Sequence, residues 1–339
     1  MKSILITGGA GFIGSNFIPY FLNKNSDTEI VNIDKLTYAG DLDNLGHIEG
    51  HKNYTFVEGD ICDRDLIETL FSKYNFDGVI HFAAESHVDN SITSPDEFIR
   101  TNIFGTFTLI DVARNHWMET PHKYKERHEN CRFHHISTDE VYGTLGKTGL
   151  FMESTPYAPN SPYSASKASS DFIVRSYFHT YGMNVITTNC SNNYGPKQHD
   201  EKLIPTIIRK ALAEENIPIY GDGKNIRDWL YVLDHCRGIE LVYKKGNSGE
   251  TYNIGGRNER NNNQIASKIC EILDIKIPRK NGESYKKLIT YVKDRPGHDL
   301  RYAIDATKIE NELGWEADEN FETGIQKTIS WYLEKYNTK

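Results

Sequence analysis

Short apolar runs alternate along the first 195 residues with longer segments in which apolar residues recur at helical spacing. Each apolar run stops at polar residues and is expected to form a buried strand. These runs are residues 4–7, 30–34, 54–60, 79–84, 133–137 and 185–189. Amphipathic helices are expected at residues 65–74, 95–116 and 164–181. This alternation predicts an α/β fold with a doubly wound, Rossmann-like parallel sheet and right-handed crossovers.

The pattern changes after about residue 195. Elements become shorter, Gly, Pro and Asn become more frequent, and long loops are expected at residues 216–227 and 281–300. We therefore predict a Rossmann-like domain at residues 1–195 and a smaller region at residues 196–339 that closes over a ligand. Their boundary is expected to be interdigitated, because the second part could return strands to the main sheet.

A glycine-rich loop, GGAGFIG at residues 8–14, follows the first predicted strand and precedes a helical segment. It fits G-x-x-G-x-x-G from Gly8 or G-x-G-x-x-G from Gly9, and the missing side chains let backbone N–H groups approach a pyrophosphate. Asp34 ends the second predicted strand 20 residues after Gly14, where a carboxylate binds ribose hydroxyls and repels the extra phosphate of NADP. This context predicts an NAD site.

The ends of the third and fourth predicted strands belong to the same edge of the sheet. Asp60 and Ile61 follow the third strand, where they can reach an adenine ring, and Ala83 and Ala84 close the fourth. The two alanines are small enough for a cofactor to lie against the backbone. We therefore expect all four residues to contribute to the dinucleotide site.

Candidate catalytic residues form two clusters. Tyr163 and Lys167, in the sequence YSASK, are four residues apart and lie on one face of the predicted helix. A nearby ammonium and a cationic nicotinamide are both expected to lower the pKa of the tyrosine towards neutrality, which makes it a usable base. Asp139 and Glu140 are adjacent in STDEVYG, at the end of the fifth predicted strand. Two carboxyl groups in different surroundings can divide into an acid and a base, as elimination of water requires.

Charge and cysteine content exclude several classes of protein. The net charge is −8 and no long cluster of Lys and Arg is present, so nucleic-acid binding is not expected. The sequence predicts neither a secretory signal nor a membrane span, because its apolar runs are only strand-sized. The five cysteines include no C-x-x-C pair, which favours reduced thiols and a cytoplasmic protein, and no metal site is expected.

Taken together, these motifs resemble those of the extended short-chain dehydrogenase/reductases and, among them, the dTDP-glucose 4,6-dehydratases. The resemblance rests on the glycine loop, STDEVYG and YSASK, together with HFAAESHVD at residues 81–89, SNNYGP at residues 191–196 and DRPGH at residues 294–298. It covers most of the chain, and the combination is far more specific than any single motif.

The resemblance implies an enzyme that oxidises, dehydrates and re-reduces dTDP-glucose while NAD stays bound. Tyr163 would remove the C4 hydroxyl proton as a hydride passes from C4 to NAD, with Lys167 and Thr138 tuning and orienting it. Glu140 would take the C5 proton and Asp139 would protonate the departing C6 hydroxyl. The hydride would then return to C6 and a proton to C5.

Two sets of binding residues and a homodimer follow from the same resemblance. The cofactor set is Gly8, Gly11, Phe12, Ile13, Gly14, Asp34, Lys35, Asp60, Ile61, Ala83, Ala84, Ser86, Thr101, Tyr163, Lys167 and Asn193. The substrate set is His87, Thr138, Asn192, Lys202, Leu203, Pro218, Tyr220, Arg227, Asn262, Arg295 and His298. The charges of Lys202, Arg227 and Arg295 suit a diphosphate. The helices at residues 95–116 and 164–181 are the expected dimer interface.

Three alternatives remain open at this point. A nucleotide-sugar 4-epimerase or decarboxylase shares the fold, the cofactor and the Tyr-Lys pair, but has no need for the acids Asp139 and Glu140. A 4,6-dehydratase for a UDP-, GDP- or CDP-linked hexose is the second, and a non-catalytic NAD-sensing protein or scaffold is the third. Two segments depart from the family pattern, because residues 197–200 (KQHD) are more polar than the aromatic sequence expected there and Asn263-Gln264 replaces a more apolar pair.

Overall fold

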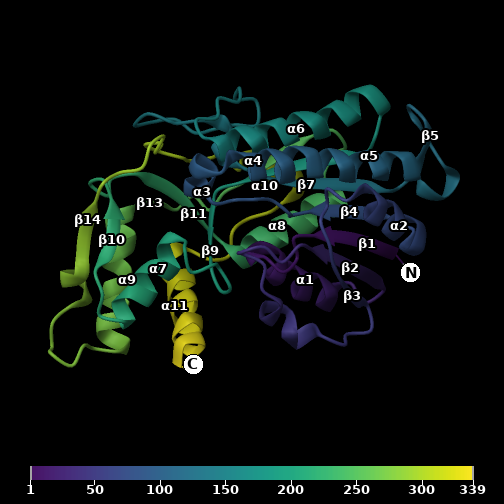
Figure 1. Cartoon of the computed structure of the whole chain (residues 1–339). Helices are drawn as coiled ribbons and strands as arrows, with labels where there is room; N and C mark the ends of the chain where they lie inside the picture. The colour runs from purple at the N-terminus through teal and green to yellow at the C-terminus, as the bar shows by residue number, and fades with distance from the viewer. Residues whose placement is uncertain (1, 338–339) are drawn as a thin grey trace.

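A seven-stranded parallel sheet lies at the centre of the computed structural model, which describes residues 2–337 (Figure 1). Its strand order is β12-β8-β7-β4-β1-β2-β3. The strands are β1 (Lys2–Thr7), β2 (Thr28–Asp34), β3 (Tyr54–Glu58), β4 (Gly78–His81), β7 (Arg132–Thr138), β8 (Val185–Cys190) and β12 (Thr251–Ile254). The six strands predicted from the sequence and the doubly wound class are confirmed, although β3 and β4 end earlier than expected. Residues 59–61 and 82–84 therefore lie in the loops beyond these strands, at the carboxyl edge of the sheet.

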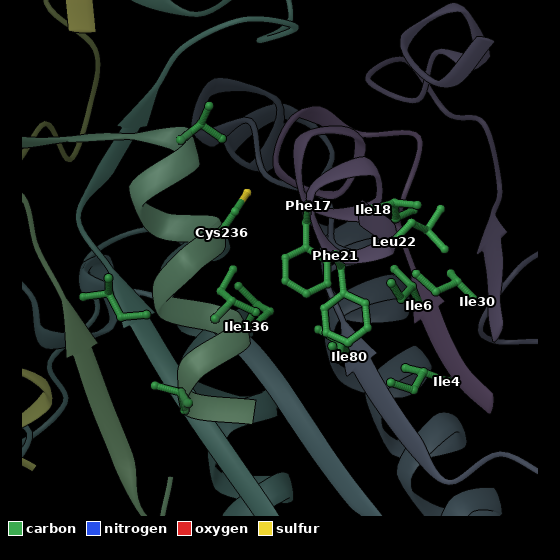
Figure 2. Packing of buried hydrophobic residues seen from close by; sticks show 14 of the residues in the cluster. Ile4, Ile6, Phe17, Ile18, Phe21, Leu22, Ile30, Ile80, Ile136 and Cys236 are labelled. Atoms are coloured by element: carbon green, nitrogen blue, oxygen red, sulfur yellow. The ribbon is translucent and has the colours of Figure 1, made fainter. Parts of the chain in front are cut away.

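Helices cover both faces of the sheet because successive apolar side chains along its strands point to opposite faces. Ile4 and Ile6 belong to the core beneath α1 (Phe12–Lys24) and α8 (Val232–Lys245). Figure 2 shows Phe17 and Phe21 of α1 packed over the strands in this core. Leu5 belongs to the opposite core, which is covered by three other helices, namely α2 (Arg64–Tyr74), α5 (Thr106–Trp117) and α6 (Pro162–Tyr181).

The single helix expected at residues 95–116 is instead divided into three parts. A short α4 (Pro95–Phe98) leads into a π-helical turn (Ile99–Gly105) and then into α5. Gly105 ends the wide turn, where a Cβ atom would lie 2.6 Å from Cδ1 of Ile61. Apolar periodicity does not distinguish a π-helical turn from α-helix, so the sequence pattern alone gave no sign of it.

The second half of the chain builds a smaller lobe but also returns to the main sheet. The lobe contains two small sheets and three helices around its own apolar core. One sheet consists of β9 (Asn192–Tyr194), β11 (Ile226–Tyr231) and β13 (Glu259–Asn261), and the other of β10 (Ile217–Tyr220) and β14 (Ile289–Val292). The helices are α7 (Leu203–Leu212), α9 (Asn262–Lys276) and α11 (Phe321–Asn337). Between these elements, α8 packs on α1 and β12 pairs in parallel with β8. The two predicted parts of the chain are therefore interleaved.

The remaining elements are short. They are α3 (Val88–Thr93), α10 (Thr307–Leu313), β5 (Met118–Thr120) and β6 (Lys123–Tyr124), with 3₁₀ helices at Leu42–Ile48, Glu126–His128, Asp139–Tyr142 and Tyr285–Leu288. Within residues 2–337, no helix combines the length and apolar character needed to cross a bilayer. The same part of the chain holds no group of three His, Cys, Asp or Glu residues arranged for a metal ion.

Candidate active site

A single cavity opens at the carboxyl edge of the sheet, where β1 and β4 lie side by side and the chain winds away in opposite directions. Open α/β sheets bind their ligands at such a point. Every residue predicted to bind the cofactor lines this cavity, and so do Thr138, Asp139, Glu140, Tyr163 and Lys167. The fold therefore brings together side chains that are far apart in the sequence.

The glycine loop closes one side of the cavity. Gly8 has a φ of +71°, and a Cβ atom there would lie 2.6 Å from Cα of Ala83, so only glycine fits. Gly14 packs equally closely, because its Cβ would lie 2.5 Å from the carbonyl oxygen of Gly8. Helix α1 then begins at Phe12 with no side-chain cap and no acidic residue in its first turn. Its first N–H groups are available to an anion, as a pyrophosphate requires.

Asp34 fixes the shape of this loop as well as facing the cavity. Its Oδ2 accepts a hydrogen bond from the backbone N–H of Ala10 at 2.9 Å, and its Oδ1 accepts one from Leu36 at 2.9 Å. Each oxygen keeps a further lone pair for a ribose hydroxyl. Nearby, Lys35 and Asp60 form an ion pair at 3.0 Å. The donors, acid and small residues on this side of the cavity fit a dinucleotide without a 2′-phosphate.

Tyr163 and Lys167 lie on α6, where it enters the cavity. A capping box fixes the start of the helix: Ser161 Oγ accepts from the backbone N–H of Ser164, and Ser164 Oγ accepts from that of Ser161. Lys167 is buried and its Nζ donates to the carbonyl oxygen of Ile136 at 2.9 Å. Burial lowers the pKa of Lys167 to about 8.

The pKa of Tyr163 differs from the sequence-based expectation. Burial and the neighbouring Glu140 raise the pKa of the phenol well above its usual value, whereas a hydrogen bond with Thr138 acts in the opposite direction. The expected fall towards neutrality is therefore not found for the protein alone, because burial outweighs the hydrogen bond. A cationic ring bound beside the phenol would lower the pKa.

Asp139 and Glu140 occupy one 3₁₀ turn but have different surroundings. Asp139 is buried, its Oδ2 has no hydrogen-bond partner, and burial together with Glu140 raises its pKa well above the usual range. Burial also raises the pKa of Glu140, but the positive charges of Arg227, Arg295 and Lys202 oppose that rise. Asp139 is therefore suited to carry a proton and Glu140 to accept one.

The cations near Glu140 come from three elements of the second half of the chain. Arg227 on β11 lies over the ring of Tyr302, 4.2 Å from its centroid. Lys202, at the N-terminus of α7, lines the cavity and donates to the carbonyl oxygen of Ser86 at 3.1 Å. Arg295 follows β14, and its Nη1 is buried without a hydrogen-bond partner. These groups form a positively charged wall beside the carboxyl pair.

The other predicted substrate residues are placed less uniformly. Asn192 lines the cavity, and His87 lies 3.8 Å from Glu201 at its rim. Tyr220 and His298 contact each other edge to face, with ring centroids 6.3 Å apart. Of the predicted substrate residues, Thr138, Asn192 and Lys202 line the cavity, and eight do not, namely His87, Leu203, Pro218, Tyr220, Arg227, Asn262, Arg295 and His298.

The polar stretch at residues 197–200 joins the two halves of the chain across the cavity. Lys197 Nζ donates to the carbonyl oxygens of Ser15 at 3.0 Å and Asn44 at 2.8 Å, both in the N-terminal half. His199 contacts the ring of Tyr38 edge to face at 5.6 Å. The departure from the expected aromatic sequence therefore supplies hydrogen bonds from a half-buried lysine.

Sequence reasoning missed Asn102, which lies in the π-helical turn. Its Oδ1 accepts from the backbone N–H of Glu85 at 2.9 Å, and its Nδ2 donates to Ser166 Oγ at 2.8 Å. Asn102 thus connects the loop after β4 with α6 between Tyr163 and Lys167. No spacing in the sequence marks this contact, because it depends on the wider π-helical turn.

Comparison with known proteins places this site in a family. The sequence matches the family described as GDP-mannose 4,6 dehydratase over residues 5–328. A dTDP-glucose 4,6-dehydratase of Xanthomonas campestris pv. campestris is 54% identical over 333 residues, which cover 98% of this chain and 93% of the relative.

Two solved structures extend the similarity to the fold. A dTDP-glucose 4,6-dehydratase of Bacillus anthracis in complex with NAD has a TM-score of 0.87 and 45% identity, covering 99% of this chain and 98% of that one. A dTDP-glucose 4,6-dehydratase of Streptomyces venezuelae with NAD and TDP bound has a TM-score of 0.90 and 42% identity, with the same coverage. The chain belongs to the dTDP-glucose 4,6-dehydratase family of extended short-chain dehydrogenase/reductases.

Proposed function

We propose that the protein is an NAD-dependent dTDP-glucose 4,6-dehydratase, a lyase that converts dTDP-glucose into dTDP-4-keto-6-deoxyglucose and water. The observation that carries this proposal is the pair Asp139 and Glu140, whose surroundings favour a protonated and an ionised carboxyl group in the same cavity as Tyr163. The glycine loop and Asp34 would hold NAD, which would supply the hydride acceptor and donor that the reaction needs.

The first step is oxidation at C4. Tyr163 accepts the proton of the C4 hydroxyl while the C4 hydride leaves, so that C4 becomes a ketone. The buried Lys167 stabilises the phenolate by its positive charge, and Thr138 orients the phenol through their hydrogen bond. The ketone then acidifies the C5–H bond.

The second step is loss of water across C5 and C6. Glu140 takes the C5 proton, and Asp139 gives its proton to the C6 hydroxyl, which leaves as water. Glu140 later returns a proton to C5 when the hydride reaches C6. The proton that Tyr163 gained balances the one that Asp139 lost, and exchange with solvent resets both groups.

We assign residues 1–195 chiefly to NAD and residues 196–339 chiefly to the nucleotide sugar. Lys202, Arg227 and Arg295 neutralise the diphosphate, with Asn192 and His87 at the sugar. Leu203, Pro218, Tyr220, Asn262 and His298 complete the nucleotide side. The charge of the three cations is the physical support for this assignment.

A 4-epimerase is the second candidate, because it needs the same Tyr-Lys pair and cofactor. It has no use for a proton donor and acceptor at C5 and C6. A buried carboxyl oxygen without a hydrogen-bond partner, as at Oδ2 of Asp139, costs stability, and a role in the elimination explains why that cost is tolerated. The observation therefore favours the dehydratase.

We further propose a homodimer formed through the helices that begin at Pro95 and Pro162. Exposed apolar side chains gather on this face, with Ile99 and Phe104 on the π-helical turn, Phe107 on α5 and Phe172 on α6. Helices α5 and α6 pack beside each other (Figure 1). Large exposed aromatic residues on adjacent helices are typical of an interface between protein chains.

The cytoplasm is the compartment that we propose for this enzyme. The thiols of Cys62, Cys131, Cys190, Cys236 and Cys270 are all free. Disulfides are rare in reducing compartments, where unpaired thiols persist. The proposed substrate also favours an intracellular enzyme, because a nucleoside diphosphate sugar is an activated metabolite.

The test is turnover without added cofactor. Purified protein supplied with dTDP-glucose alone should form a 4-keto-6-deoxy sugar, which is detected by its absorbance in alkali. Tyr163→Phe should keep the bound cofactor but stop the initial oxidation. Folded, cofactor-loaded protein that formed no keto sugar from dTDP-glucose would rule the proposal out, and product formation from UDP-glucose at the same rate would remove its specificity for the thymidine nucleotide.

A further inference from the structure

Asp171 is a buried carboxyl group that the mechanism above does not use. It lies on α6, four residues after Lys167 and eight after Tyr163, so the three side chains share one face of the helix. Asp171 is 4% exposed, and a carboxyl group this deeply buried requires partners. Its surroundings therefore show what it does.

Two hydroxyl groups donate hydrogen bonds to the same oxygen of Asp171. Ser137 Oγ donates to Oδ2 at 2.9 Å, and Tyr157 Oη donates to Oδ2 at 3.0 Å. The Tyr157 oxygen itself accepts from Asn189 Nδ2 at 3.2 Å, so its proton is directed towards Asp171. Both hydroxyl groups act as donors, which suits an ionised carboxylate.

The other oxygen of Asp171 faces His135. His135 Nε2 lies 3.1 Å from Asp171 Oδ1 and 3.2 Å from Ser170 Oγ. The Ser170 hydroxyl already donates to the carbonyl oxygen of Lys167 at 2.7 Å, so its oxygen accepts from His135, and Nε2 carries the proton. Oδ1 of Asp171 therefore lies beside a polar N–H group but accepts no hydrogen bond from the described residues, whereas Oδ2 accepts two.

Lys167 needs a negative charge nearby, because it is buried and the only hydrogen bond described for its ammonium is to a neutral carbonyl group. The other titratable groups close to it are His81 on β4, His135 on β7 and Cys190 on β8. Burial lowers the pKa of both histidines well below the usual value and raises that of the Cys190 thiol, so all three are neutral near pH 7.

Asp171 is the group in this set that is ionised at neutral pH. Burial raises its pKa to about 6, against the opposing effects of Lys167, Ser137 and Tyr157. Its charge in turn raises the pKa of Lys167, which burial has lowered to about 8. Between these two values, both members of the pair are charged.

We propose that Asp171 is a positioning residue, the fixed counter-charge that keeps Lys167 an ammonium inside the protein and so allows Tyr163 to act as a base at neutral pH. This inference rests on the roles proposed above for Tyr163 and Lys167. Asp171 touches neither the sugar nor the cofactor in this scheme. It acts on the reaction only through the charge of Lys167.

The direction of the effect follows from the charges. With a neutral residue at position 171, the pKa of Lys167 falls, and less ammonium remains at pH 7 to 8. The phenolate of Tyr163 then loses stabilisation and its pKa rises. The acidic limb of the pH profile, which is the range where kcat rises with pH, should therefore move to higher pH.

The kinetic test compares Asp171→Asn with Asp171→Glu. Asp171→Asn should move the acidic limb of kcat upward by about one pH unit while the KM for dTDP-glucose stays unchanged. Asp171→Glu keeps the charge, so its acidic limb should lie close to that of the wild-type protein. The matched control is Asp234→Asn, a buried carboxyl group on α8 that accepts from the backbone N–H of Glu319 at 2.9 Å and lies outside the cavity. It should lower stability without moving the limb.

A second readout does not depend on activity. In Asp171→Asn, the folded protein holds the Lys167 proton less tightly than the unfolded chain over the range from about pH 6 to about pH 8. The urea midpoint of this variant should therefore rise with pH in that range more steeply than the midpoint of the wild-type protein. Parallel midpoints would contradict the proposal, as would an acidic limb that stays in place or moves to lower pH.

Further variants separate the possible failures. If Asp171→Asn does not fold, Tyr157→Phe removes one donor from Asp171, raises the pKa of that carboxyl group and should move the limb upward by a smaller amount. An unmoved limb in Tyr157→Phe would then count against the proposal. If Tyr163→Phe turns over dTDP-glucose normally, Tyr163 is not the base and the proposed function is wrong at that step. If Tyr163→Phe is inactive and the Asp171 variants leave the acidic limb unchanged, only the inference about Asp171 fails.

Discussion

Asp139 and Glu140 show how two adjacent residues of similar chemistry acquire opposite properties. The buried carboxyl group of Asp139 has one oxygen without a partner, so its neutral form is favoured. Glu140 lies near Arg227, Arg295 and Lys202, whose charges favour its ionised form. The difference arises from the three-dimensional surroundings, because Arg227 acts on both carboxyl groups whereas Arg295 and Lys202 oppose the rise at Glu140.

This difference predicts distinct defects for the two amide variants. Glu140→Gln should leave oxidation at C4 intact but slow the elimination by about 100-fold, because a general base is lost. Reduced cofactor should then accumulate on the enzyme, and exchange of the C5 hydrogen with deuterated water should stop. Rapid-mixing absorbance of NADH and mass spectrometry of the recovered sugar measure the two effects.

Asp139→Asn provides the matched comparison. It should slow the loss of water to a similar extent while C5 exchange continues, because Glu140 can still remove and return the C5 proton. If Glu140→Gln and Asp139→Asn lost C5 exchange equally, the division of roles between the two carboxyl groups would be wrong.

At this scale the sequence predicted the groups that follow recognisable spacing. Tyr163 and Lys167 are four residues apart, and Asp34 stands at the distance from the glycine loop that a ribose-binding acid requires. Asp171 stands at the same helical spacing as Lys167, yet its partners Ser137 and Tyr157 come from other segments. Only the folded chain brings those donors to it, so sequence spacing gave no reason to single it out.

Among the elements, α6 matters most to the proposed mechanism, because it presents Tyr163, Lys167 and Asp171 along one face. Its start is set by the reciprocal hydrogen bonds between Ser161 and Ser164. Tyr163 lies in the first turn, so a frayed helix end would displace the phenol before any other catalytic group. The capping box therefore contributes both to stability and to the placement of the proposed base.

Ser161→Ala should lower the free energy of unfolding by about 1 kcal/mol, because the N–H of Ser164 loses its acceptor. Urea unfolding followed by circular dichroism measures this change. Ser161→Thr keeps the acceptor and should recover most of the loss. Ser176→Ala, at an exposed position of the same helix, should change stability little, and an equal loss at Ser176 would show that the cap is not the cause.

Element prediction succeeded where one periodicity continued and failed where the backbone changed its hydrogen-bonding pattern. The strands at residues 30–34 and 133–137 were found because apolar runs end sharply at polar residues. The π-helical turn at Ile99–Gly105 interrupts the predicted helix without any change in apolar spacing. β12 was also missed, since Thr251–Ile254 includes the polar residues Thr251 and Asn253 and forms no continuous apolar run.

At the scale of the whole molecule, the face formed by the π-helical turn, α5 and α6 is the proposed contact between two copies of the chain. Phe104 is 52% exposed and Phe172 is 57% exposed. Replacing either with glutamate should weaken the dimer by about 30-fold or more, because a charge would be buried at the centre of an apolar contact. Light scattering after size-exclusion chromatography should show a shift towards the mass of one chain.

Ile275→Glu supplies the control for that experiment. Ile275 is 83% exposed and lies on α9, in the lobe remote from this face, so its replacement should leave the mass unchanged. A loss of dimer in Ile275→Glu, or an unchanged mass in both phenylalanine variants, would locate the contact elsewhere.

The predicted division at residue 195 rests on the change in element length and composition and does not describe the path of the backbone. Residues 232–254 leave the smaller lobe to supply α8 and β12 to the main sheet. The sequence cannot reveal such a return directly, because a strand of four residues gives little sign of the sheet that it will join. The pairing of β12 with β8 is decided by the assembled sheet.

The position of β12 at the sheet edge also affects how the protein is made. Once Cys190 has emerged from the ribosome, all six strands of the sheet other than β12 are outside it, yet the outer side of β8 still presents unpaired backbone groups. That edge stays open to pairing with another nascent chain until Ile254 has emerged. Synthesis without a pause between these two points therefore protects the newly made enzyme from aggregation.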